Sequence, residues 1–143
     1  MARTVQRFEV SLKAFVLKGE EALFLRERDT GYWELPGGRI DVGEEHLAHA
    51  EILAREITEE LGPGMKIEFS DAAVSWTRAH PDGRPWVFLL ARVGHWIEGE
   101  PDLSPEHDGK IWATRERAHE LQFPPRSGYR DGIERLWRVL RIG

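Results

Sequence analysis

The sequence contains no cysteine, and this absence excludes several kinds of chemistry at once. Disulfide bonds, thiolate metal sites and a cysteine nucleophile all require the missing side chain. Long apolar runs are also missing, since the longest one, residues 86–91, is far shorter than the ~20 residues of a membrane-spanning helix. The N-terminal stretch MARTVQRFEV has no apolar core of the kind that secretory signals carry. We therefore expect a cytoplasmic protein that does not bind membranes.

A positive net charge is missing too, since 25 acidic residues outnumber 20 lysines and arginines. The net charge of −5 argues against a protein that coats nucleic acid through its overall charge, although it allows a small basic pocket. The apolar fraction of 41% lies well above that of disordered chains, and 143 residues suffice for one domain with its own core. We predict a single domain over residues 1–143, with neither nucleic acid nor membrane as a partner. The aromatic content is compatible with a homodimer.

Hydrophobic periodicity and glycine-rich breaks divide the chain into strands and helices. Strands are predicted at 8–19, 21–28, 65–76, 86–93 and 109–114, and helices at 45–61, 115–121 and 129–142. The segment 29–44, DTGYWELPGGRIDVGE, is dense in glycine, proline and aspartate and is predicted to be a loop with a tight backbone. Strands on both sides of a long helix, with another helix at the end, predict an α/β fold with a mixed sheet between helices.

The helix predicted at 45–61 carries three carboxylates close together. At about 100° per residue, Glu56, Glu59 and Glu60 share one side, opposite an apolar seam of residues 47, 50, 54, 57 and 61. Like charges at this spacing repel one another. The side is therefore either simply solvated or faced by a cation such as Mg²⁺, which takes oxygen ligands and bridges carboxylates to substrate phosphates. Taken alone, the helix favours the solvated alternative.

The loop before this helix completes a known pattern. Gly37, Gly38 and Gly43 allow the backbone to approach a ligand closely, although an ordinary tight connection also uses glycine. Loop and helix together, GGRIDVGE…REITEELG, resemble the Nudix box, G-x5-E-x7-R-E-U-x-E-E-x-G-U, in which U is aliphatic. Gly38 and Glu44 match its front, and residues 55–60 and 62 match its back. The chain is thus identified as a member of the Nudix hydrolase family, and the resemblance implies an α/β/α sandwich with a mixed β-sheet.

Two departures from the pattern concern its spacing and its end. Ten residues rather than seven separate Glu44 from Arg55, and Pro63 stands at the last aliphatic position. Three extra residues amount to about 4.5 Å of helical rise, and they either lengthen the helix at its N-terminus or bulge the loop. The sequence leaves both alternatives open, and Glu45 is an alternative to Glu44.

The resemblance implies a diphosphate hydrolase that depends on Mg²⁺ or Mn²⁺. It implies metal ligands at Glu44, Glu56, Glu59 and Glu60, helped by the backbone of Gly37 and Gly38. Glu59, Glu60 or a carboxylate from a loop would accept the proton of the attacking water. Arg55 would orient a carboxylate through a bidentate contact, with a surface ion pair as the simpler alternative.

Two segments outside the box add candidate residues. Arg26 and Arg28 alternate onto the side of their strand that carries Phe24, and this side faces either the cleft, where arginine suits phosphate, or solvent. The segment LSPEHDGKIWAT resembles a late segment of many Nudix enzymes. In it Glu106 is a candidate metal contact or base and His107 a candidate base, with a plain polar loop as the alternative.

Two functions of different classes follow from these residues. The first is a hydrolase that splits a nucleoside diphosphate linked to another moiety, with nucleoside triphosphates, oxidised nucleoside triphosphates and nucleotide sugars as small-molecule substrates. The alternative is a Nudix-like nucleotide-binding or sensor domain without turnover. The insertion in the box is its only support, and the intact REITEE argues against it. Isopentenyl diphosphate isomerase shares the fold but relies on a catalytic cysteine, which this chain lacks.

Overall fold

The computed structural model describes residues 2–80 and 82–140, which form one sheet flanked by helices. The strands are β1 (Glu9–Lys18), β2 (Glu21–Glu27), β3 (Trp33–Glu34), β4 (Gly37–Arg39), β5 (Lys66–Arg78), β6 (Val87–Glu98) and β7 (His107–Ala113). Their order is β3-β2-β1-β6-β5, with β4 also paired to β1 and β7 to β2. β1 and β6 run parallel and the other pairs antiparallel, so the sheet is mixed as predicted.

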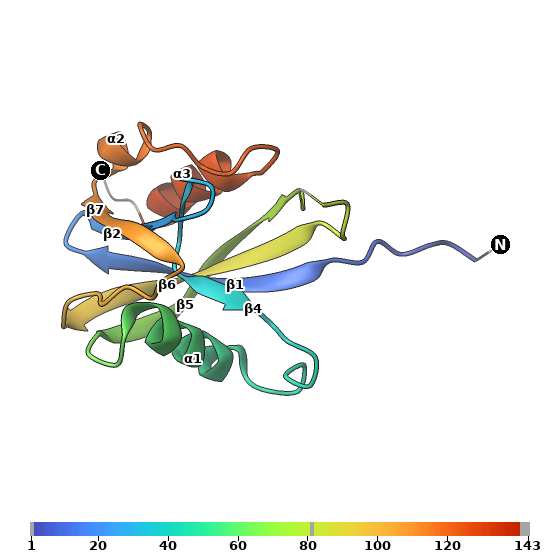
Figure 1. Cartoon of the computed structure of the whole chain (residues 1–143), viewed down its shortest axis with the longest axis horizontal. Helices are drawn as coiled ribbons and strands as arrows, with labels where there is room; N and C mark the ends of the chain where they lie inside the picture. Colours follow the sequence, from blue (N-terminus) through green and yellow to red (C-terminus); the bar gives the residue numbers. More distant parts are fainter. Residues whose placement is uncertain (1, 81, 141–143) are drawn as a thin grey trace.

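Helices cover both faces of this sheet (Figure 1). α1 (His49–Leu61) lies on one face, and α2 (Arg115–Ala118) and α3 (Tyr129–Leu140) lie on the other. Side chains that alternate along the strands enter two separate apolar clusters. Leu23 and Leu25 of β2 pack on the α1 side, whereas Phe24 packs with Trp137 on the α3 side. This confirms the predicted α/β/α sandwich.

The run predicted as a central strand at 86–93 does lie inside the sheet. It forms most of β6, which is hydrogen-bonded to β1 on one side and to β5 on the other. Val87, Leu89 and Val93 are fully buried on the α3 side, and Leu90 packs in the cluster on the α1 side. A strand covered on both faces needs apolar residues at successive positions, which explains the unbroken run.

The predictions around 29–61 were wrong in detail. The segment 29–44 is not all loop, because β3 and β4 pair with β2 and β1. The helix begins at His49 and not at residue 45. Leu47, Ala50 and Ala54 of the predicted seam are exposed, whereas the buried apolar residues are Ile52, Leu53, Ile57 and Leu61. Burying isoleucine and leucine removes more apolar area from water than burying alanine, and this decides which side of the helix faces the sheet.

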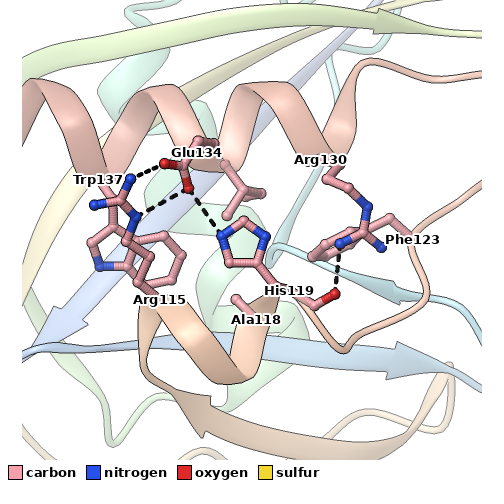
Figure 2. Close-up of a pocket in the computed structure, with 8 residues that line it drawn as sticks. Arg115, Ala118, His119, Phe123, Arg130, Glu134 and Trp137 are labelled. Atoms are coloured by element: carbon pink, nitrogen blue, oxygen red, sulfur yellow. Dashed lines mark hydrogen bonds and ion pairs between the residues drawn. The ribbon is translucent and has the colours of Figure 1, made fainter. Parts of the chain in front are cut away.

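Charged side chains fasten the short α2 to α3 (Figure 2). Arg115 donates hydrogen bonds to Glu134, and Nε2 of His119 lies 3.3 Å from the same carboxylate. Arg130 donates to the carbonyl oxygens of His119 at 2.8 Å and of Leu121 at 2.7 Å. The hollow among these residues measures about 10 Å³, which is room for one water molecule. We refer to the cluster of Arg115, His119, Arg130 and Glu134 as the helix clasp. It joins α2 to α3 and offers no space for a substrate.

Candidate active site

A hollow of about 540 Å³ is lined by residues of α1, of every strand except β6, and of the loops before β3 and β7. Its acidic lining residues are Glu27, Asp29, Glu34, Glu56, Glu59, Glu60 and Glu106. Lys13, Arg39, Arg78 and His107 are its basic ones. This carboxylate hollow brings together the predicted Glu56, Glu59, Glu60 and Glu106. An excess of negative charge in a concave site raises the local concentration of cations.

Two glycines let the helix carboxylates reach the sheet. Gly37 has φ of +143°, and a Cβ there would lie 2.0 Å from the carbonyl oxygen of Leu12. A Cβ at Gly38 would lie 2.1 Å from Oε2 of Glu56. Position 37 therefore requires glycine for its backbone, whereas a side chain at position 38 would displace the carboxylate of Glu56. The N–H of Gly37 donates to Oε1 of Glu60 at 2.6 Å.

Glu60 lies deeper than its sequence position suggested. The prediction placed it opposite the buried seam, but the residue is only 6% exposed and its carboxylate lies between Gly37 and His107. It is buried because the paired β1 and β4 bring polar partners beneath the helix at this point. Burial raises the pKa of Glu60 to about 7, even though Lys13 and the Gly37 N–H stabilise the ionised form.

Arg55 contacts three carboxylates. Its Nη2 lies 2.7 Å from Glu44 and 3.2 Å from Glu56, and its Nη1 lies 3.1 Å from Glu59. Glu56 is half-buried, and burial raises its pKa while Arg55 opposes the rise. Glu59 is mostly exposed at the rim. The predicted orienting contact of Arg55 thus reaches two of the helix carboxylates and one from the loop.

The structure decides between the two alternatives for the extra residues. They bulge the loop before His49 and do not lengthen α1. Glu44 reaches Arg55, whereas Glu45 accepts a hydrogen bond from the N–H of Gly43 at 2.7 Å. Glu44 does not line the carboxylate hollow, because its carboxylate is held by Arg55 and by the N–H of Asp41 at 2.9 Å. Glu44 therefore comes near Glu56 and Glu59 through their shared contact with Arg55, but it does not line the hollow with them.

The floor of the hollow is a buried polar cluster. Nε2 of His107 lies 3.0 Å from Oε1 of Glu34 and 3.6 Å from Oε2 of Glu60, and Nζ of Lys13 lies 3.9 Å from Oε2 of Glu34. Burial would raise the pKa of Glu34, but Lys13 and His107 together lower it to about 2. Burial favours neutral Lys13 and His107, yet Glu34 raises the pKa of both. Glu34 is thus held ionised beside two cationic groups.

Sequence analysis named only His107 and Glu60 from this floor. Lys13 and Glu34 were missed, although a lysine inside the apolar run of β1 is an unusual residue for a buried strand and could have drawn attention. Glu34 gave no comparable signal. It comes to Lys13 because Gly37, three residues further on, pairs with Lys13 in the sheet.

Arg26 and Arg28, for which the sequence left both the cleft and solvent open, lie outside the carboxylate hollow. Arg26 donates to Asp108 at 2.8 Å, and Arg28 donates to the carbonyl oxygen of Pro105 at 2.9 Å. The register between β2 and β7 shifts only after Arg26, so Arg26 keeps the side of Phe24, and its guanidinium lies 5.6 Å from the ring centroid of Trp33. The arginines that do line the hollow are Arg39 and Arg78.

Comparison with known proteins assigns this arrangement to a family. Residues 8–135 match the family model of the NUDIX domain. The chain belongs to the Nudix family. A protein of Mycobacterium tuberculosis named "Putative 8-oxo-dGTP diphosphatase 2" is 36% identical over 97 residues, which make up 66% of this chain and 62% of that protein. This Nudix chain therefore spans less than two thirds of the length of that curated relative.

Solved structures share the same fold. The MutT protein from Methanosarcina mazei superposes with a TM-score of 0.74 at 24% identity, covering 97% of this chain and 99% of that one. A structure described as a UDP-X diphosphatase superposes with a TM-score of 0.76 at 17% identity, covering 97% of this chain and 66% of that one. At these identities the likeness shows a Nudix fold and nothing about substrate.

Nudix hydrolases use divalent metals, and the donor set of this chain suits one. Glu34, Glu60 and His107 place one ligand atom each within 4.8 Å of one another. Mg²⁺ and Mn²⁺ prefer oxygen ligands, and the helix carboxylates supply them beside this group. The side chains present therefore fit a divalent cation.

Proposed function

We propose that this chain is a divalent-metal-dependent hydrolase that cleaves the diphosphate linkage of a nucleoside diphosphate joined to another moiety. The excess of carboxylates in the carboxylate hollow carries the proposal, since Lys13, Arg39 and Arg78 do not balance it. Burial raises the pKa of Glu56 and of Glu60, which shows that their ionised forms are unfavourable without a cation. A bound cation would relieve this penalty.

Mg²⁺ or Mn²⁺ would be held by Glu56, Glu59 and Glu60. When bound, such a cation draws negative charge from the phosphoryl oxygens that are under attack. Arg55 holds Glu56 and Glu59 in position, and the Gly37 N–H fixes one oxygen of Glu60. These contacts already restrict the carboxylate side chains, so less conformational entropy is lost when a metal binds.

Glu106 is the residue we assign as general base. It lines the same hollow, and within residues 2–80 and 82–140 its carboxylate makes no hydrogen bond or ion pair. Glu60 suits the task less well because the Gly37 N–H and His107 occupy its oxygens. Glu59, which Arg55 contacts at 3.1 Å, is the second choice.

The substrate classes we propose are nucleoside triphosphates, including oxidised ones, and nucleotide sugars. The similarity to the mycobacterial protein supports 8-oxo-dGTP as the first compound to try. A non-catalytic nucleotide-binding domain is the weaker alternative, since the carboxylate hollow retains Glu56, Glu59, Glu60 and Glu106 together.

Location and partners complete the proposal. Among the described helices, none has both the length and the apolar composition for crossing a membrane. We propose a cytoplasmic location, one domain over residues 1–143, and a small-molecule substrate in place of nucleic acid or membrane. The homodimer stays a prediction.

A substrate panel tests the proposal. Phosphate or pyrophosphate release is measured from nucleoside triphosphates, 8-oxo-dGTP and UDP-glucose with Mg²⁺, with Mn²⁺ and with excess chelator. We expect release that requires the cation and that Glu56→Gln abolishes. The matched control is Glu51→Gln, an exposed glutamate in the first turn of the same helix, which should retain activity. Binding of nucleotides without any release would instead support the non-catalytic alternative.

A further inference from the structure

A second hollow of about 600 Å³ adjoins the carboxylate hollow. The two share Glu27, Glu34, Arg39 and Arg78, so they meet along a common wall. The remaining surface differs, because Tyr32, Pro124 and Pro125 supply flat apolar faces. Its size lies within the ~300–1,000 Å³ of small-molecule sites. We refer to this space as the proline hollow.

The common wall carries two arginines in different states. Arg39 forms an ion pair, since its Nε lies 3.0 Å from Oε1 of Glu9. The guanidinium of Arg78 makes no hydrogen bond or ion pair within the described residues, 2–80 and 82–140. Burial raises the pKa of Glu27, and the positive charge of Arg78 opposes this rise. The two charges therefore interact electrostatically without direct contact. Arg78 is therefore a cation that faces both hollows and has no hydrogen-bond or ion-pair partner among the residues that the structure describes.

The fold fixes the direction of Arg78. It is the last residue of β5, and it follows Val74 and Trp76 on the same face of the strand. Both of those residues are buried in the α3-side cluster, so the strand cannot rotate Arg78 away from the hollows without exposing them. A half-buried guanidinium with five donors and no acceptor is unfavourable until a ligand supplies one.

We propose that Arg78 binds the phosphate that carries the nucleoside, so that the nucleoside lies in the proline hollow and the rest of the scissile diphosphate extends into the carboxylate hollow. The inference rests on the proposed function. The guanidinium fork matches two oxygens of one phosphate, and a position on the common wall places that phosphate between the two spaces. Tyr32 and Pro124 offer faces against which a base can stack. The substrates are then nucleoside-linked diphosphates and not inorganic polyphosphates.

Calorimetric titration with AMP, GMP, CMP and UMP, each against its own nucleoside, tests the inference without turnover. The wild type should bind at least one monophosphate about tenfold more tightly than the nucleoside, and Arg78→Gln should remove that preference. Arg78→Lys should restore part of it. Arg92→Gln is the matched control, because Arg92 is a half-buried sheet arginine that lines neither hollow. Circular dichroism confirms that each variant is folded.

Three outcomes separate the inference from the proposed function. An Arg78→Gln variant that keeps the phosphate preference, or a wild type that has none, overturns the inference. A wild type with an Arg78-dependent preference that releases no phosphate with any cation overturns the proposed function alone. Tyr32→Leu should weaken nucleoside and monophosphate equally, and unchanged nucleoside binding in this variant would show that the base lies outside the proline hollow. In turnover, Arg78→Gln should raise KM about tenfold and change kcat little.

Discussion

Two clusters of charged side chains in this protein contain similar residue types. They differ in how far basic groups balance the carboxylates. The helix clasp joins Arg115, His119 and Glu134 around a space of about 10 Å³. The floor of the carboxylate hollow joins Lys13, Glu34, Glu60 and His107 beneath a space of about 540 Å³. In the clasp one carboxylate is shared by two basic groups, whereas the hollow has more carboxylates than cations.

This difference distinguishes a binding site from a cluster of ion pairs that only stabilises the fold. A cluster whose charges satisfy one another lowers the free energy of the folded state by a small amount and binds nothing more. A cluster with raised carboxylate pKa values beside an open space is unfavourable until a cation arrives. The four predictions below test this distinction.

The largest effect is expected from the helix carboxylates. Glu56→Gln removes a charged oxygen ligand and should lower kcat/KM by at least about 100-fold, because even outer-shell changes at metal sites reduce function by 10- to 100-fold. Steady-state kinetics at saturating Mg²⁺ measures the loss. Equal activity of Glu56→Gln and wild type would mean that this carboxylate holds no metal.

The pH dependence of stability should follow Glu60. Its folded pKa of about 7 exceeds the ordinary glutamate value of 4.5, so the folded state binds the proton more tightly than the unfolded state. Without divalent cations, stability should fall by about 2 kcal/mol as the pH rises from 5 to 7. Glu34, whose pKa is lowered to about 2, adds its own pH dependence only below the ordinary value of 4.5. Denaturant melts across this pH range measure the slope, which Glu60→Gln should flatten.

Gly38→Ala should act on the hollow without unfolding the protein. The added Cβ would meet the carboxylate of Glu56, which is the end of a flexible side chain and can move aside. We expect about tenfold weaker Mn²⁺ binding, consistent with the sensitivity of metal sites to ligand placement. Titration of Mn²⁺ followed by electron spin resonance measures it, and unchanged affinity would show that the site tolerates a displaced Glu56.

The smallest effect is expected from the helix clasp. Glu134→Gln removes the ion pairs to Arg115 and His119 and should destabilise the fold by about 1 kcal/mol or less, because the pairs are partly exposed. Thermal melting measures this change. Catalytic activity at 25 °C should be unchanged, and a large loss of activity would remove the contrast between the two clusters.

Local sequence patterns predicted the parts of the site that are close in the chain. The resemblance to the Nudix box identified Glu56, Glu59 and Glu60 and the Gly37–Gly38 turn, whereas helical spacing alone favoured a solvated side. Lys13, Glu34 and Arg78 come from separate strands, and only the sheet register brings them together, as the pairing of Lys13 with Gly37 shows. Register depends on long-range packing, which a single sequence does not display. The same limit applies to Arg26, whose partner Asp108 comes from the paired strand β7.

Because the extra residues bulge out of the loop before α1, this loop can change its length without moving the residues of the site. Glu44 and Arg55 stay 2.7 Å apart across the longer loop, and Val42 near its start is fully exposed. Residues 45–48 can accordingly be lengthened, or can accept a fluorescent reporter, while the ion pair keeps the helix and its carboxylates in place. A motif search with a fixed seven-residue gap would pass over this chain, although Glu44 and Arg55 remain paired across the longer loop.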